Sequence, residues 1–383
     1  MKKVKLGEVC EILNGFAFKS SLYVNEGIRI IRITNVQKGY IEDSDPKYYP
    51  IEYTNSIEKY ILKENDLLMS LTGNVGRVGL ISKTMLPAAL NQRVACLRTI
   101  DSLISKEYVF QFLNSDLFEQ SAIRSSNGVA QKNLSTDWLK KVEITYPSVE
   151  QQELITSTLN LIERLICCRK KQNKKFNELV KSRFNEMFIL SDFSLKRLGE
   201  LVDEVRYGTS LPATINGKYG YLRMNNITEN GKLNIQNLKH IDIPEKDLEK
   251  YVVRKGDVLF NRTNSIELVG KTCIYELDFD MVIAGYIIRI RTNNNILNPR
   301  YLSEFLNFPS TKKFLRNIAK GAVNQANINA KELQDISIPL APLSLQNEFA
   351  DFVAQVDKSQ LAIQKSLDEL ETLKKSLMQE YFG

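Results

Sequence analysis

The chain consists of two similar copies of one sequence unit, and this duplication limits the possible folds more than any other feature. A Leu-Gly-Glu segment at residues 6–8 returns at 198–200, and residues 60–79 match residues 251–270 at a constant shift of 191. Along the whole chain the shift stays between 191 and 195. A period this long indicates duplication of an entire unit rather than a short solenoid repeat. The 383 residues are therefore predicted to form two similar halves.

Each copy begins with strand-like segments and continues with helical ones. Residues 27–33 and 284–291 are short alternating runs of the kind typical of strands, and residues 108–113 and 301–306 are predicted to be helical. A Pro-x-x-x-Gln-x-Glu pattern from Pro147 or Pro342 then begins a long helical tract. The predicted fold class is α+β. Its segments are a domain at 1–148, a long helix at 149–190, a second domain at 191–343 and a C-terminal long helix at 344–383.

The two long tracts carry apolar stripes that predict helix pairing. The second stripe follows a heptad pattern, and the first is less regular. The first tract is net positive and the second net negative, which favours contact between them. The alternative is two unrelated amphipathic helices, each packed on its own domain. The residues predicted to pair the helices are Leu154, Leu161, Leu165, Phe176 and Val180 on the first, and Phe349, Val353, Val356, Ile363, Leu367, Leu370 and Leu377 on the second.

The composition argues against most kinds of enzyme. His240 is the only histidine, so a Ser-His-Asp triad and most transition-metal sites are not expected. The five cysteines form no C-x-x-C pair and are interpreted as free thiols in a reducing compartment. We predict neither a cofactor nor a metal. No apolar stretch is long enough to span a membrane, and Met1-Lys2-Lys3 precedes no signal-type block, so the expected location is the cytoplasm.

Three sequence patterns weakly suggest chemistry. Residues 265–272 nearly match a phosphate-binding loop, but Ser265 stands where its first glycine belongs. Asp45-Pro46 and Asn298-Pro299 both lack the second proline of a DNA methyltransferase site, and Asp45-Pro46-Lys47 fits a nuclease pattern only loosely. A self-contained DNA-modifying enzyme is therefore the less favoured alternative. A non-catalytic assembly scaffold is the other, and weak salt dependence of DNA binding would distinguish it from a DNA reader.

The chain resembles the specificity (S) subunit of type I restriction-modification enzymes over essentially its full length. The resemblance rests on the order and duplication of four segments and not on any single motif. These segments are the Leu-Gly-Glu openings, the strand-and-loop at 64–72 and 255–263, the glycine-amide segments at 128–134 and 321–328, and the Pro-x-x-x-Gln-x-Glu helix entries.

This resemblance implies two target-recognition domains, each reading one half of a split site in double-stranded DNA. It also implies that the long helices pair antiparallel, set the gap between the half-sites and dock two methyltransferase subunits. Restriction subunits would join through the complex, and the chain itself would have no catalytic site. Because the two halves differ in side chains, the half-sites should differ and the whole site should be asymmetric.

Side chains with paired donors and acceptors cluster in the loops between the matched strands. Arginine, asparagine and glutamine read base edges, whereas lysine and hydroxyl groups fix phosphates. The candidates in the first copy are Ser70, Thr72, Asn74, Arg77, Asn91, Gln92, Arg93, Gln131, Lys132 and Asn133. In the second copy they are Tyr219, Arg223, Asn261, Arg262, Thr263, Asn264, Lys320, Asn324 and Gln325. Loops of this composition also serve simply as turns.

A comparison of the copies separates two kinds of candidate. Matched pairs such as Thr72/Thr263 and Asn35/Asn226 are predicted to serve the scaffold or to contact phosphate. Mismatched pairs such as Asn74/Ser265 and Arg77/Leu268 are predicted to encode the sequence that is read.

Overall fold

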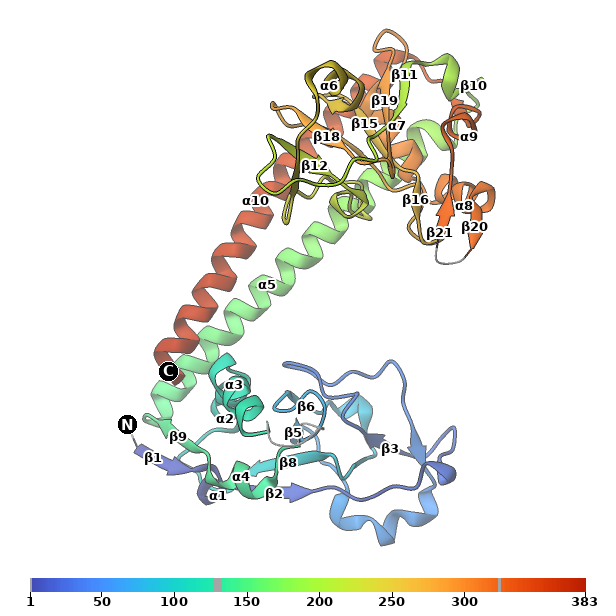
Figure 1. Cartoon of the computed structure of the whole chain (residues 1–383). Helices are drawn as coiled ribbons and strands as arrows, with labels where there is room; N and C mark the ends of the chain where they lie inside the picture. Colours follow the sequence, from blue (N-terminus) through green and yellow to red (C-terminus); the bar gives the residue numbers. More distant parts are fainter. Residues whose placement is uncertain (1, 127–132, 323–324) are drawn as a thin grey trace. The chain divides into compact units, whose positions relative to one another are not determined.

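A computed structural model describes residues 2–126, 133–322 and 325–383 (Figure 1). The chain divides into two compact units. Unit 1 comprises residues 1–170 and 365–383, and unit 2 comprises residues 171–364. Each unit contains one copy of the α+β domain together with part of each long helix, α5 (Val149–Phe184) and α10 (Leu343–Phe382). Among the described residues, no helix is both long and apolar enough to cross a membrane.

Unit 1 is built around a four-stranded sheet with the order β2-β8-β5-β6 and a three-stranded sheet with the order β4-β3-β7. Strands β3 and β7 are parallel, whereas β1 and β9 form a separate antiparallel pair. The strands are β1 (Lys2–Lys5), β2 (Cys10–Asn14), β3 (Ile28–Ile31), β4 (Tyr48–Tyr49), β5 (Leu67–Ser70), β6 (Val78–Leu80), β7 (Ala88–Leu90), β8 (Val94–Thr99) and β9 (Glu143–Tyr146). The short helices are α1 (Leu6–Val9), α2 (Lys106–Leu113), α3 (Asp116–Ser125) and α4 (Thr136–Lys141).

Unit 2 repeats this plan and adds to it. Its four-stranded sheets have the orders β11-β19-β15-β17 and β13-β12-β18-β14, and β12 and β18 are parallel as β3 and β7 are. The strands are β10 (Leu195–Arg197), β11 (Val202–Tyr207), β12 (Tyr219–Leu222), β13 (Lys239–Ile241), β14 (Val252–Val253), β15 (Val258–Asn261), β16 (Thr263–Asn264), β17 (Thr272–Ile274), β18 (Met281–Ile283), β19 (Ile287–Thr292), β20 (Lys320–Ala322), β21 (Gln325–Asn327) and β22 (Ser337–Pro339). The short helices are α6 (Glu245–Tyr251), α7 (Pro299–Asn307), α8 (Pro309–Ile318) and α9 (Ala330–Gln334).

Local sequence explains where several of these helices begin. The side chains of Ser105, Ser115 and Ser135 each accept the amide N–H three residues further on, at the starts of α2, α3 and α4. In unit 2, Asn298 caps α7 in a similar way, and a proline occupies the first turn of that helix. Such caps satisfy amide groups that have no partner inside the helix.

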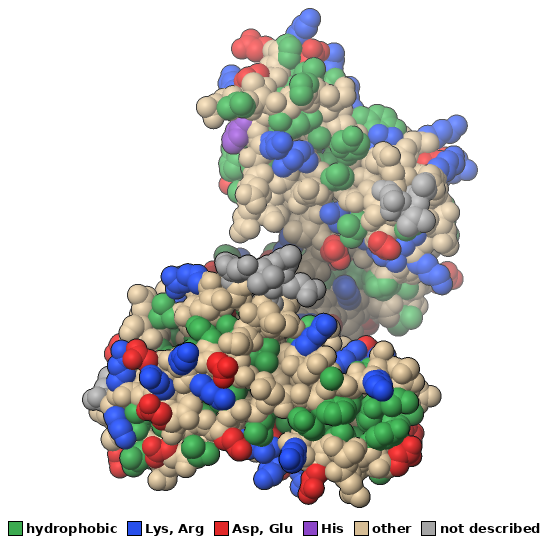
Figure 2. Space-filling model, turned by 60° about the horizontal axis from the view of Figure 1, so that its bottom comes forward, with side chains coloured by type: hydrophobic (Ala, Val, Ile, Leu, Met, Phe, Trp, Pro, Cys, Tyr) green, Lys and Arg blue, Asp and Glu red, His purple; other side chains and the backbone are tan. Residues whose placement is uncertain are grey.

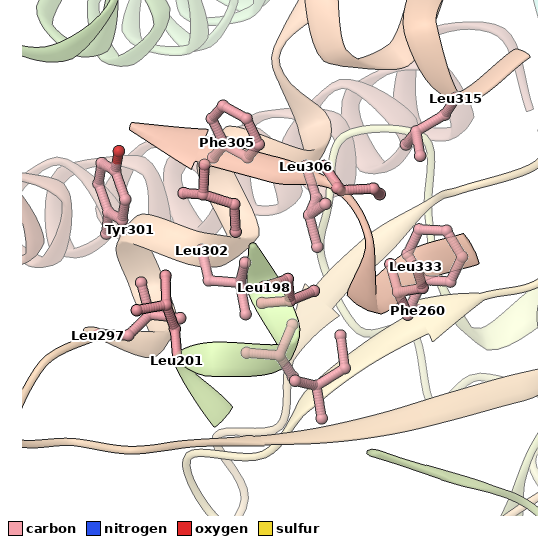
Figure 3. Packing of buried hydrophobic residues seen from close by; sticks show 14 of the residues in the cluster. Leu198, Leu201, Phe260, Leu297, Tyr301, Leu302, Phe305, Leu306, Leu315 and Leu333 are labelled. Atoms are coloured by element: carbon pink, nitrogen blue, oxygen red, sulfur yellow. The ribbon is translucent and has the colours of Figure 1, made fainter. Parts of the chain in front are cut away.

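The largest core of unit 2 lies between the sheet β11-β19-β15-β17 and helices α7 and α8. Figure 3 shows Phe260 of β15 together with Tyr301, Leu302 and Leu306 of α7, and all four side chains are buried. Leu198, from the Leu-Gly-Glu segment, points into the same cluster and is fully buried. The leucine of the repeated Leu-Gly-Glu opening is therefore part of the core, and in unit 1 the equivalent Leu6 is also fully buried.

The repeat extends to individual hydrogen bonds of a buried glutamine. Gln152 is fully buried, accepts the amide of Ser105 at 2.9 Å and donates to the carbonyls of Leu103 at 2.8 Å and Pro147 at 3.0 Å. In unit 2, Gln346 makes the equivalent three bonds. Its partners are Asn298 at 2.9 Å, Ile296 at 3.1 Å and Ala341 at 2.8 Å. These bonds tie the first turn of each long helix to the loop that begins α2 or α7. They also correct the sequence match, because Gln346 corresponds to Gln152 and not to Gln151.

A buried ion pair is repeated as well. In unit 1, Asp66 is 6% exposed and accepts hydrogen bonds from Arg98 at 2.6 and 2.9 Å. In unit 2, Asp257 is 5% exposed and accepts from Arg291 at 3.1 Å. The second copy adds Arg289, which is fully buried beside Asp257 and donates to Glu204 and to a backbone carbonyl. In both copies the shared aspartate therefore links the start of one strand, β5 or β15, to the neighbouring strand, β8 or β19.

Within each unit, α5 and α10 pair antiparallel, as the fold class predicted. In unit 1, Lys374 bonds Glu163 at 2.8 Å and Lys170 bonds Glu371 at 3.0 Å. In unit 2, Arg183 bonds Glu348 at 3.3 Å. These pairs join the positive tract to the negative one. Most of the α10 stripe faces inward: Phe349, Val353, Val356, Ile363 and Leu367 are buried, while Leu370 and Leu377 are half-buried.

The predicted stripe on α5 is partly wrong. Leu154, Leu161 and Leu165 are 66%, 57% and 41% exposed, so they do not pair the helices. The inward face of α5 in unit 1 instead carries Ile155, Leu159 and Ile162, which are buried. Leucines and isoleucines lie close together here, so two faces of the helix are apolar, and the predicted stripe fell on the exposed face. In unit 2, Phe176 and Val180 are half-buried, and Val180 packs against the main core.

Candidate nucleic-acid interface

In both units the candidate loops gather where two parallel strands end. Strands β3 and β7 end at Ile31 and Leu90, and the amide of Asn91 donates to Ile31 at 3.2 Å. Strands β12 and β18 end in the same way, with the amide of Ala284 donating to Leu222 at 2.9 Å. The carboxyl ends of parallel strands are a common place for ligands, because loops diverge there and leave room between them.

Three candidate loops of unit 1 meet at this edge. The amide of Leu71, in the loop after β5, donates to Arg93 at 2.9 Å, and the amide of Leu134 donates to Leu71 at 2.7 Å. Thr72 also forms a β-bridge with Asn133. The structure therefore brings the loop after β5, the loop after β7 and the segment at 133–134 together. The candidates exposed on these loops are Asn74, Gln92, Arg93 and Asn133, with Thr72, Arg77 and Asn91 half-buried.

Unit 2 has the same arrangement with different side chains. The amide of Arg262 donates to Tyr286 at 3.0 Å, and its carbonyl accepts the amide of Ile328 at 2.9 Å. Strand β16 then pairs with β21, which pairs with β20, and this places Asn264 near Gln325. Gln325 and Lys320 are exposed, and Arg262 and Asn264 are partly exposed. Lys320 forms an ion pair with Glu332 at 2.5 Å.

Three candidates are too buried to reach a nucleic acid. Ser70 is 1% exposed; its hydroxyl donates to Asn74 and accepts the amide of Arg77 at 3.1 Å. Asn261 is fully buried and Thr263 is 7% exposed; Thr263 donates to Asn327 at 3.0 Å. Short polar side chains in tight loops commonly bond the neighbouring chain in this way. These residues shape the loops and do not belong to the contact surface.

Buried asparagines fix the chain just beyond the parallel strands. Asn35 accepts the amide of Arg32 at 3.0 Å, and Asn226 accepts the amide of Arg223 at 2.8 Å. Both asparagines are almost completely buried, so they serve the scaffold. They place Arg32 and Arg223 at equivalent positions. Arg32 was missed as a candidate in the sequence, although its match with Arg223 in the repeat could have identified it.

Tyr219 is not brought to the other candidates of unit 2. It is the first residue of β12, whereas Arg223 follows the last residue of that strand. The ring of Tyr219 lies 5.3 Å from the ammonium group of Lys218. Gln131, Lys132 and Asn324 lie outside the described residues, so their predicted roles have no structural description.

The loop that follows β5 in unit 1 differs in length from the equivalent loop that follows β15 in unit 2. In unit 1, residues 71–76 are closed by bonds between Ser70 and Arg77, and the amide of Gly76 donates to Ser70. In unit 2, residues 262–270 are closed by bonds between Asn261 and Lys271, and the amide of Gly270 donates to Asn261. Gly76 and Gly270 both have φ of +79°.

These bonds correct the match at constant shift. Arg77 corresponds to Lys271 and not to Leu268, and the second loop is three residues longer. Asn74 and Ser265 therefore stand in loops of unequal length and are not equivalent positions. Lys271 is buried, and its ammonium group donates to the carbonyl of Met224 at 3.1 Å, so the Gly-Lys-Thr segment leads into β17 and belongs to the packing of unit 2.

Two of the buried cysteines offer little reactivity. Burial raises the pKa of the Cys10 and Cys273 thiols to about 12, so both stay protonated and are weak nucleophiles near neutral pH. His240, purple in Figure 2, is exposed. Among the described residues, no group of three or more histidine, cysteine or acidic side chains could hold a metal ion. Figure 2 also shows that the basic side chains on this face are interspersed with acidic and neutral ones.

Comparisons with known proteins agree with this duplicated architecture. The family model described as "Type I restriction modification DNA specificity domain" matches residues 1–178 and again 191–373. A putative type I restriction enzyme specificity subunit, MjaX, from Methanocaldococcus jannaschii is 32% identical over 51% of this chain and 46% of its own length. The EcoBI specificity subunit of Escherichia coli is 25% identical over 99% of this chain and 85% of its own length.

Solved structures show the same fold. The S subunit of a type I restriction-modification system from M. genitalium has a TM-score of 0.61 and 17% identity, and covers 100% of this chain and 96% of its own. A structure from a study of assembly and conformational transition of the type I system also has a TM-score of 0.61, with 18% identity and 97% coverage of its own chain.

The structure is one domain plan present twice, with polar loops gathered at the parallel-strand edge of each copy. The chain belongs to the family of type I restriction-modification DNA specificity proteins. Two relatives that align with 99% and 98% of this chain are named as specificity subunits of type I restriction enzymes.

Proposed function

We propose that the chain reads a bipartite, asymmetric DNA site, with one half-site bound by each copy of the domain. The proposed target-recognition domains are residues 1–148 and 191–343. The supporting observation is that the copies share their buried hydrogen bonds but differ in the side chains of the loops at the parallel-strand ends. A common scaffold with different surface loops would give two half-sites of different sequence.

The paired helices are proposed to fix the gap between the half-sites. Helix α5 has 36 residues, which corresponds to about 50 Å and exceeds one turn of B-DNA, roughly 34 to 36 Å. The buried glutamines support this role, because Gln152 and Gln346 join the start of each helix to the domain that precedes it. A rigid joint at each helix start would keep the spacing constant.

We further propose that the helices dock two methyltransferase subunits and that restriction subunits join through them. The chemistry would then come from the partners, and the place of action would be the cytoplasm, where the DNA and these subunits meet. One of the similar solved structures comes from work on complex assembly of the type I system, which is in keeping with this proposal.

The test is to co-express the chain with its methyltransferase subunit and map the methylated bases in genomic DNA. The expected result is one motif with two unlike specified parts and a constant unspecified gap. Exchanging residues 191–343 for the same region of a relative with another target should change one part only. A palindromic motif, or methylation independent of this chain, would contradict the proposal.

A further inference from the structure

Arg262 of unit 2 is held by an aromatic ring at the parallel-strand edge. Its guanidinium carbon lies 4.8 Å from the centre of the ring of Tyr207, the last residue of β11. The hydroxyl of that ring accepts the amide of Ala330 at 2.7 Å, and Arg262 Nη1 contacts the carbonyl of Gly285 at 3.4 Å. A ring fixed at its far end and a carbonyl at one nitrogen together restrict the plane of the guanidinium.

The scaffold does not need an arginine at this position. In unit 1 the equivalent residue is Leu71, and its amide and carbonyl make the same two backbone bonds as those of Arg262. The counterpart of Tyr207 is Asn14, the last residue of β2, which donates to Thr136 at 3.3 Å. Both members of the Arg–Tyr pair are therefore specific to unit 2.

The arginine also carries a cost that packing alone does not explain. Its Nε is buried and, within the described part of the chain, has no hydrogen-bond partner. Leaving a buried donor unpaired is unfavourable. Tyr207 remains 41% exposed, and Tyr286, whose carbonyl accepts the amide of Arg262, is 50% exposed. The pair thus lies at the surface, in the loop region where the copies differ.

We propose that Tyr207 is a positioning residue that holds Arg262 for a G·C pair in the half-site read by unit 2. This inference rests on the proposed DNA-reading function and assigns one base contact within it. A guanidinium recognises guanine through two parallel hydrogen bonds, to O6 and N7 in the major groove. Two parallel bonds require a fixed plane, and an aromatic ring held against the guanidinium limits the planes that it can adopt.

The experiment uses the complete complex with its methyltransferase subunit and a panel of duplexes. Each base pair of the unit 2 half-site is replaced in turn by each of the three other base pairs, one replacement per duplex. The wild-type complex should prefer G·C at one position by about 5- to 150-fold, the range of a bidentate arginine–guanine contact. Arg262→Ala should abolish this preference at that position alone. Tyr207→Leu should reduce it about 3- to 10-fold, and Tyr207→Phe, which keeps the ring, should retain most of it.

Two further measurements separate positioning from folding and from phosphate contact. The melting temperature should be the same in Tyr207→Leu as in Tyr207→Phe, because both lose the bond to the Ala330 amide. The slope of log affinity against log salt should be the same in Tyr207→Leu as in the wild type, because no phosphate contact is lost. Tyr48→Leu is a matched control, since it removes the ring that lies 5.2 Å from Arg29 in unit 1. It should leave the unit 2 half-site unchanged.

Each outcome decides the proposal. If Arg262→Ala weakens binding equally for all sequences, Arg262 contacts phosphate and the assignment is wrong. If Arg262→Ala removes the preference but Tyr207→Leu keeps it in full, Tyr207 does not position the arginine. A split site that Arg262→Ala leaves unaltered overturns this inference alone, whereas a wild-type complex with no split site overturns the proposed function and this inference with it.

Discussion

The buried glutamine at the start of each long helix gives a prediction whose size follows from its contacts. Gln152→Ala removes three hydrogen bonds and leaves one amide and two carbonyls without their partner. Unpaired buried groups cost roughly 1–3 kcal/mol each, but two of the three bonds are only partly buried, and water can replace them in part. We expect a loss of about 3 kcal/mol in the free energy of unfolding of unit 1.

The single tryptophan allows this loss to be measured in one unit. Trp138 belongs to unit 1, so its fluorescence during urea unfolding reports on that unit. With a urea dependence of up to about 3 kcal/mol per molar, the fluorescence midpoint should fall by about 1 M or more in Gln152→Ala. Gln346→Ala should instead lower the midpoint of the far-ultraviolet circular dichroism transition and leave the fluorescence midpoint nearly unchanged.

A neighbouring residue provides the control. Gln151 is exposed and is the glutamine that the helix-entry pattern singled out, so Gln151→Ala should shift neither transition. Equal shifts in Gln151→Ala and Gln152→Ala, or a shift of Gln152→Ala below about 0.2 M, would refute the argument from buried hydrogen bonds. A fluorescence shift as large in Gln346→Ala as in Gln152→Ala would show that the units do not unfold separately.

Two other predictions concern buried charges. Asp257→Asn should lower the free energy of unfolding by about 3 kcal/mol or more, because breaking a buried ion pair leaves its partner charge unpaired. Urea unfolding should show a larger loss for Asp257→Asn than for Asp66→Asn, because Asp257 faces Arg289 as well as Arg291. Burial lowers the pKa of Lys312 from 10.5 to about 7. The unfolded chain therefore binds the extra proton between these values, so the free energy of unfolding should rise with pH from about 7 to 10, and Lys312→Met should remove that rise as measured by urea midpoints.

Much of the fold could be predicted because its repeated elements rest on local signals. Alternating strands and proline-led helix starts are each encoded within a few residues, and both recur in the second half of the chain. The inward face of α5 could not be predicted in the same way. Leu154 and Ile155 are adjacent and both apolar, and only contact with the rest of unit 1 decides that Ile155 is buried.

The site was harder to predict because residue type does not reveal exposure. Asn261 and Gln325 are both amide-bearing loop residues, yet the first is fully buried and the second is exposed. The constant shift also paired Gly79 with Gly270, although the structural equivalent of Gly270 is Gly76. Only the backbone hydrogen bonds and the shared positive φ identify this equivalence. Predicted contacts at Asn74, Gln92, Arg93, Arg262 and Gln325 remain predictions.

The unequal loops at 71–76 and 262–270 have a consequence for how such a protein can acquire new targets. Both loops close on the same pair of strands through the same glycine amide bond, so three residues are gained without any change in strand register. The length of this loop therefore does not affect how the two strands on either side of it pair. Insertions and deletions, and not substitutions alone, can then supply new recognition surfaces, and each can be tolerated the moment it arises because the closing bonds do not depend on what lies between them.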